Sequence, residues 1–195
     1  MSTKIEIVNA ALAHAGQKSL ASLTAQTPEA DFIDRIYTVK LKEALALHSW
    51  RFAREFVQLN RLAALSVSKS LPQYQLPNDH IRTIGVQVDG VDFFDFEQSK
   101  DKLLIGGAGE NSVVILEYTT SNISETSLGA HFVPVLALLL GSACALSLAR
   151  DRELAGDLYS DMSRMALPVA RSIDSQQGRT KSLRRSRLTN AHRGG

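Results

Sequence analysis

The chain has 195 residues, of which 44% are hydrophobic, and this is enough for one domain with a real core and a small subdomain. The formal net charge of +2 hides an asymmetry, because residues 171–195 hold seven Arg and Lys side chains against Asp174 alone. Residues 1–170 are therefore mildly acidic, and only the tail is basic.

Cys144 is the only cysteine, so an intrachain disulfide and a thiolate metal cluster are excluded. It lies in an apolar run, which predicts a raised thiol pKa and a role in packing. The residues after Met1 show no apolar signal region. We expect the chain to be made in a reducing cytoplasm.

Two amphipathic helices are predicted before the chain reaches Trp50. The spacing of Thr3 and Glu6 predicts a capping box at the start of the first helix, and Gly16 predicts its end. Thr27 as N-cap, followed by a proline, predicts a second helix that runs out to about Trp50. Apolar residues recur at helical spacing in both segments.

From Arg51 to Thr120 the periodicity becomes strand-like, although residues 57–65 fit either type of element. Turns are predicted at Asp89-Gly90, at residues 99–102 and at residues 106–109. The predicted strands are Ile84–Val88, Val91–Phe96, Leu103–Ile105 and Val113–Thr119.

Residues 128–149 carry no formally charged side chain and are long enough to be considered as a membrane span. Proline, glycine and serine dilute the run and no flanking aromatic belt appears, which favours a helix buried on all sides. Small residues recur at every fourth position and predict close packing against another helix or subunit: Ala137, Gly141, Ala145 and Ala149. A last helix is predicted after Asp151, with Pro168 near its end.

These elements predict an α+β fold that is mainly α: an antiparallel helical bundle with a β-rich insertion and an extended C-terminal arm. Residues 1–52 and 123–172 are the two halves of the bundle, residues 53–122 the insertion, and residues 173–195 the basic arm. The arm is predicted to be disordered alone. It either folds on a partner or is a solvated tail without a role.

The sequence shows no constellation typical of catalysis. Its five histidines lack the spacing of a zinc site, and Gly106–Gly109 lacks the Lys-Ser/Thr of a phosphate loop. Asp92, Asp95 and Glu97 lie with three phenylalanines in a predicted strand, which is more typical of an exposed acidic face than of a cation site. We therefore predict no enzymatic activity, no cofactor and no metal.

Several segments, taken in chain order, carry a resemblance to a known family. They are Val8-Asn9-Ala10-Ala11-Leu12 with Gly16, Leu20 and Leu23, then Trp50-Arg51-Phe52-Ala53, Tyr74-Gln75-Leu76-Pro77-Asn78-Asp79 and Ile81-Arg82. With a β-rich middle, a return to helix after Phe132 and a C-terminal arm, the chain resembles the head-to-tail adaptors of short-tailed bacteriophages, called tail tubular protein A or tail accessory factor. The apolar run 135–149 departs from that pattern and leaves the related connectors of long-tailed phages open.

This resemblance implies a structural protein at the head–tail junction of the virion, made in the host cytoplasm. Copies of the chain would form a homo-oligomeric ring, dodecameric on the family's pattern, beneath the portal protein. The ring would carry the tail nozzle or tail tube protein and let DNA pass through a central channel during genome ejection. An acidic body suits a channel wall, because negative charge repels DNA phosphates.

Residue roles follow as hypotheses. The arm is assigned to contact with portal carboxylates through Arg179, Lys181, Leu183, Arg184, Arg185, Arg187 and Leu188. Trp50 and Phe52 either fill the junction between bundle and insertion or are ordinary core aromatics. Leu76-Pro77-Asn78-Asp79 is predicted to fix a turn, in which Asp79 can cap backbone N–H groups of the following residues. Tyr74, which precedes this turn, belongs to the same quoted motif. The insertion is assigned to tail proteins or neighbouring subunits.

Two other classes of function stay open. A nucleic-acid-binding protein could use the basic tail on phosphates, although the tail has no interleaved aromatic residues. A membrane-associated protein built around residues 128–149 is the weaker alternative.

Overall fold

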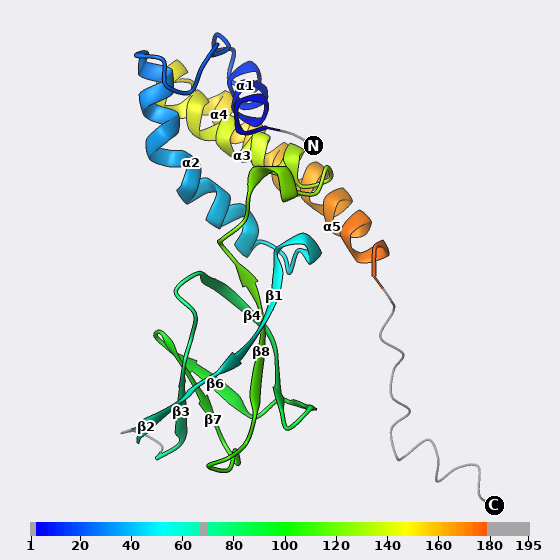
Figure 1. Cartoon of the computed structure of the whole chain (residues 1–195). Coiled ribbons are helices and arrows are strands. Elements are labelled where there is room, and N and C mark those ends of the chain that lie inside the picture. The colour runs from blue at the N-terminus through cyan, green and yellow to red at the C-terminus, as the bar shows by residue number, and fades with distance from the viewer. Residues whose placement is uncertain (1–2, 67–69, 179–195) are drawn as a thin grey trace, which may run out of the picture.

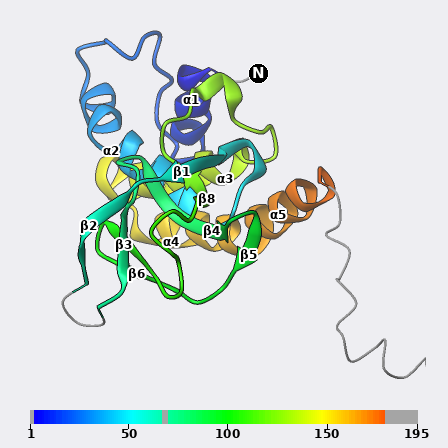
Figure 2. The ribbon, with the colours of Figure 1, turned by 60° about the horizontal axis from the view of Figure 1, so that its bottom comes forward.

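The computed structural model describes residues 3–66 and 70–178, and its helices and strands gather at opposite ends of the molecule (Figure 1). The long helices come from both ends of the described chain, whereas every described strand lies between Arg54 and Thr120. We call the helices α1–α5 the helical body and residues 54–120 the sheet region. Figure 2 views the molecule from the sheet region, with the helices behind the strands.

The first two helices begin where the sequence predicts. In α1 (Lys4–His14) the Thr3 hydroxyl accepts the Glu6 backbone N–H at 3.4 Å and the Glu6 carboxylate accepts the Thr3 N–H at 2.8 Å, which confirms the capping box. Helix α2 (Pro28–Ala46) follows Thr27, whose hydroxyl accepts a backbone N–H of the first turn. It ends earlier than predicted.

The sheet region consists of two antiparallel four-stranded sheets. Their strand orders are β1-β8-β4-β5 and β2-β3-β7-β6. The strands are β1 (Arg54–Leu59), β2 (Arg61–Leu65), β3 (Pro72–Gln75), β4 (His80–Val88), β5 (Val91–Phe93), β6 (Phe96–Ser99), β7 (Lys102–Ile105) and β8 (Val114–Thr120). Buried apolar residues from both sheets, including Leu103, Ile105 and Leu116, form one core between them.

The structure decides one assignment that the sequence left open and corrects one strand prediction. Residues 57–65 belong to β1 and β2, and the chain passes from one sheet to the other at the exposed Asn60. Residues 91–96 were expected to form one strand, but they contribute to two strands in different sheets, because the chain leaves the first sheet after Phe93. At the predicted turn of residues 76–79 the chain does turn, and the His80 backbone N–H donates to the Pro77 carbonyl at 3.1 Å. Tyr74 lies before it in β3, which pairs with both β2 and β7.

Helical structure returns after the sheets and runs to the end of the described chain. Its segments are α3 (Val133–Cys144), a π-helical turn (Ala145–Ala149), α4 (Arg152–Asp161), a second π-helical turn (Met162–Ala166) and α5 (Leu167–Gln176). The predicted helix end near Pro168 is wrong. The π turn before Pro168 already departs from the regular hydrogen-bond ladder, so a residue without an N–H is accommodated.

Helix α3 is buried by neighbours from the same chain. It packs closely on α1, and it also contacts α2 and α4. A Cβ added to Gly141 would lie 3.1 Å from the Ala11 carbonyl oxygen and 3.2 Å from His14 Cβ, so a larger residue would require α1 to shift by a few tenths of an ångström. The all-round apolar character of the run is therefore explained within one molecule.

The expectation of a mainly α fold is corrected to a mixed α+β fold, with 45% helix and 24% strand. The sheet region has its own core and is as much a structural unit as the helical body. Helix α5 also continues past residue 172, where the sequence predicted that the bundle would end. Among the described residues, no helix is long and apolar enough to cross a membrane.

Candidate functional site at the joint of the two regions

An aromatic cluster fills the place where the helical body meets the sheet region. Trp50 is completely buried, and its indole N–H donates to the Ala44 carbonyl at 3.0 Å. The ring centroids of Trp50 and Phe52 are 6.0 Å apart, and each lies 5.1 Å from that of Phe132. The joint thus contains aromatic rings from the segment that enters the sheets and from the segment that returns to helix.

A buried carboxylate ties the end of α5 to the same joint. The Asp174 residue is 1% exposed, and its carboxylate accepts the Arg51 backbone N–H at 3.1 Å. The Arg51 Nε donates in return to the Asp174 carbonyl at 2.9 Å. Arg51 begins the 3₁₀ turn that leads into β1, so Asp174 satisfies a turn N–H that would otherwise be unpaired.

Two histidines flank this carboxylate. The Nε2 atoms of His48 and His131 lie 3.4 Å and 3.3 Å from different oxygens of Asp174. Burial lowers the pKa of His48, and the nearby Asp174 carboxylate only partly opposes this effect. The arrangement joins the segment after α2, the segment before α3 and helix α5 at one point.

A second polar network lies on the sheet side of the joint. The Tyr118 hydroxyl is 3.0 Å from a Glu55 oxygen and 3.3 Å from an Asp79 oxygen, and the Thr120 hydroxyl donates to Asp79 at 2.5 Å. Burial, followed by these carboxylates, raises the pKa of Tyr118. The prediction that the Asp79 side chain caps backbone N–H groups is wrong, because hydroxyls of β8 occupy it instead.

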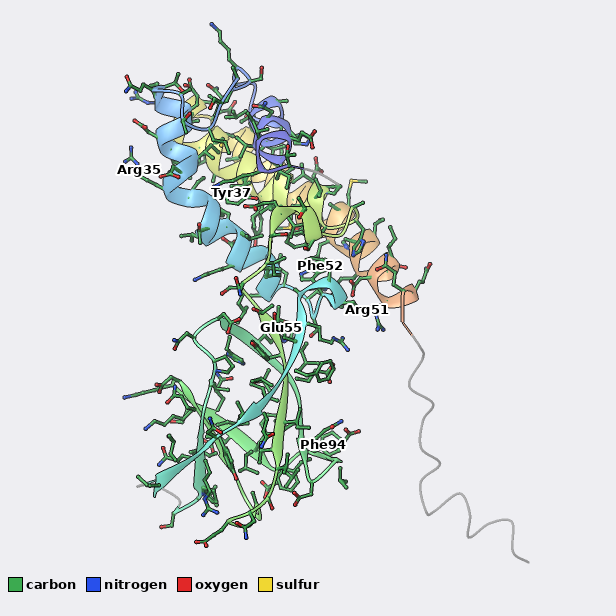
Figure 3. All side chains as sticks on the ribbon, viewed as in Figure 1. Arg35, Tyr37, Arg51, Phe52, Glu55 and Phe94 are labelled. Carbon is green, nitrogen blue, oxygen red and sulfur yellow. The ribbon has the colours of Figure 1, made fainter. Side chains whose placement is uncertain are left out.

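The other residues singled out in the sequence lie apart from the joint. Tyr74 is 1% exposed in the core between the two sheets, and Pro77 is half-buried before β4. Figure 3 shows Arg51, Phe52 and Glu55 near the joint, with Phe94 well away on the sheet region. The residues quoted for the resemblance therefore divide among α1 with the loop after it, the joint and the sheet region.

The structure describes the small-residue stripe but not the residues proposed for portal contact. Ala137, Gly141 and Ala145 are buried in the helical body, and Ala149 is exposed. Three of the four positions are thus used for packing within the chain. The proposed portal-contact residues, Arg179, Lys181, Leu183, Arg184, Arg185, Arg187 and Leu188, lie outside the described residues.

Sequence reasoning missed Asp174 and its two histidines. Asp174 is separated from Arg51 by 123 positions, and no local pattern connects them. The one available signal was that Asp174 is the single acidic residue in a basic stretch. A single carboxylate in a basic stretch can indicate that a buried donor requires it as a hydrogen-bond acceptor.

The described residues offer little reactive chemistry. Burial raises the pKa of the Cys144 thiol to about 11, which keeps it protonated and unreactive. Within residues 3–66 and 70–178, no group of three or more His, Cys, Asp or Glu side chains could hold a metal ion. No protein-family model matches the chain, and a search of curated proteins finds no significant match.

Proposed function

We propose that the protein is a structural head-to-tail adaptor of a bacteriophage virion. In this role, copies of the chain form a ring, dodecameric on the family's pattern, that docks on the portal protein through residues 179–188. The ring attaches the tail nozzle or tail tube protein and leaves a central channel. The acidic residues 1–170 suit a channel through which DNA slides without specific binding.

One observation carries this proposal: two of the regions behind the resemblance, the Trp50–Ala53 segment and the return to helix at Phe132, meet at one joint. Trp50 and Phe52 follow α1 and α2, and Phe132 precedes α3, α4 and α5. Their rings form a single cluster although Phe132 lies far along the chain. These two segments thus belong to one structural unit, the helical body, whose halves come before and after the sheet region in the chain. This favours a family resemblance over a chance series of weak patterns.

Exposed apolar side chains add support for self-association. Val39 on α2, Phe56 on β1 and Phe94 beyond β5 are 62%, 64% and 86% exposed. They occur on both the helical body and the sheet region. A closed ring requires two different contact faces on each copy, and exposed apolar residues on both regions suit that requirement.

The proposal is tested by affinity capture of the tagged full chain from cells that produce the phage, with mass spectrometry of the captured proteins. We expect a portal protein and a tail protein. The variant R184E/R185E/R187E should lose the portal protein, because its carboxylate-binding charges are reversed. The matched control K18E/K42E/K100E makes the same change of charge at exposed positions of the body and should keep it.

Removing the tail by truncation tests portal contact less cleanly than reversing its charges. A chain that stops at Ser172 also loses Asp174 and with it the contacts to Arg51. If the full chain captures nucleic acid alone, with a steep dependence on salt, the adaptor proposal is wrong and the basic tail binds phosphates.

A further inference from the structure

An exposed apolar stripe runs along the C-terminal helices beside a groove. Met165, Val169 and Ile173 follow one another at four-residue intervals, and their exposed fractions are 67%, 60% and 40%. The groove of about 460 Å³ lies between this stripe and α3, where Pro134 and Leu138 form the opposite wall. Single exposed apolar side chains are normal on a protein surface, but three large ones in a continuous row indicate an interaction site.

The helical turns before the stripe carry acidic side chains. Asp161 lines the groove, and Asp157 and Glu153 precede it at four-residue intervals in sequence. All three are exposed, as are the cations Arg152 and Arg164 of the same stretch. Arg171 donates to the Leu47 carbonyl. A segment that fits this row therefore has apolar anchors for the groove and positive charge for the carboxylates beyond it.

We propose that this groove is the docking site for the basic tail of the same molecule, with Leu183 and Leu188 as its anchors. The tail combines the two properties that the row calls for, because its two large apolar residues flank Arg184, Arg185 and Arg187. The proposal does not rest on the adaptor function and concerns the isolated chain.

The reach of the chain supports this occupant. The described chain ends at Gly178, directly after the helix whose side chains form the stripe. Val169 lies about 14 Å back along the helix from Gly178, at about 1.5 Å per residue. The five residues from Gly178 to Leu183 span up to about 17 Å when extended.

A tethered segment also has an advantage over a second copy. Short linkers give effective concentrations of about millimolar, far above that of a free protein in most solutions. The tail of the same molecule therefore reaches the groove first. If the tail also serves an outside partner, the groove holds it until that partner arrives.

Disulfide trapping in the full chain tests the proposal. In V169C/S186C we expect an intramolecular disulfide to form about tenfold faster than in the control V169C/S186C/L183D/L188D, because docking raises the local concentration. The two chains have the same tether between the cysteines, so a difference in rate reports on the anchors and not on reach. The buried Cys144 does not interfere. Equal rates overturn the proposal, and a purely intermolecular disulfide assigns the groove to a second copy and overturns it too.

Methionine oxidation gives a second readout that needs no added cysteine. A docked tail covers Met165, so L183D/L188D should raise its rate of oxidation by peroxide about threefold or more. The matched control S186D/T189D introduces the same charges beside the anchors and should not. Met162, which is 1% exposed, serves as an internal standard within each sample. An unchanged rate at Met165 in L183D/L188D overturns the proposal.

Discussion

The helical body closes its core with segments from both ends of the described chain, while the sheet region closes its core with one continuous segment. Ile7 and Leu12 of α1 share a core with Leu136 and Leu140 of α3. In the sheet region, residues 54–120 supply every described strand. The sheet region can therefore form its core from its own continuous segment, whereas the core of the helical body forms only when two segments distant in sequence meet. The joint at Trp50 and Asp174 is where the two kinds of contact are coupled.

The largest effect is expected from removing the centre of the joint. Trp50→Ala should lower the free energy of unfolding by about 3–5 kcal/mol, because it deletes a buried aromatic ring. Phe94→Ala removes an aromatic side chain that is 86% exposed and should change stability by less than about 0.5 kcal/mol. Urea unfolding followed by circular dichroism measures both. Equal losses would show that the joint is not a stabilising centre.

A substitution in the sheet core tests how far the two regions unfold together. Leu116→Ala, at a fully buried position of β8, should cost about 2–5 kcal/mol, whereas Val113→Ala, at a position 41% exposed, should cost less. Urea unfolding followed by circular dichroism gives both values.

The buried Cys144 thiol then reports on the helical body, because it is alkylated only when that core opens. If the regions unfold separately, Leu116→Ala leaves the alkylation rate of Cys144 unchanged. A rate that rises in step with the loss of stability would show that the two cores form one cooperative unit.

A smaller effect is expected from the polar link of the joint. Asp174→Ala should cost about 1–3 kcal/mol, because it leaves the Arg51 backbone N–H without its acceptor in a buried place. Asp157→Ala changes an exposed carboxylate of α4 and should be nearly neutral. Thermal unfolding of the two variants in parallel decides the point, and similar melting temperatures would contradict a structural role for Asp174.

The smallest effect is a dependence on pH, to which each region contributes one histidine. Burial lowers the pKa of His48 at the joint and of His80 on β4 below their usual 6.5. Between the lowered and the usual pKa the unfolded chain binds more protons, so stability falls as pH falls through 6.5 and then levels off.

The melting temperature should therefore drop between about pH 7.5 and pH 5.5, and His48→Gln or His80→Gln should each reduce that drop. His14→Gln, at an exposed position, is the control. A drop that both variants leave unchanged would place the pH dependence elsewhere.

Much of the fold could be predicted from local patterns. The capping box at Thr3, the N-cap at Thr27 and the turn at Asp89-Gly90 each depend on atoms within a few residues of one another, and the structure has all three. The burial of α3 followed from its composition alone. The division of residues 91–96 between two sheets could not be predicted, because both strands show the same alternation.

The sequence by itself determined where helices begin, which stretch is buried and that a basic tail follows an acidic body. Only the tertiary structure decided which residues meet. It placed Asp174 against Arg51, Gly141 beneath Ala11, and Met165 in an exposed row beside a groove. The physical reason is the separation in sequence between the residues that interact. Caps and turns form between near neighbours in sequence, whereas a buried carboxylate or an exposed apolar face depends on distant segments that only packing brings together.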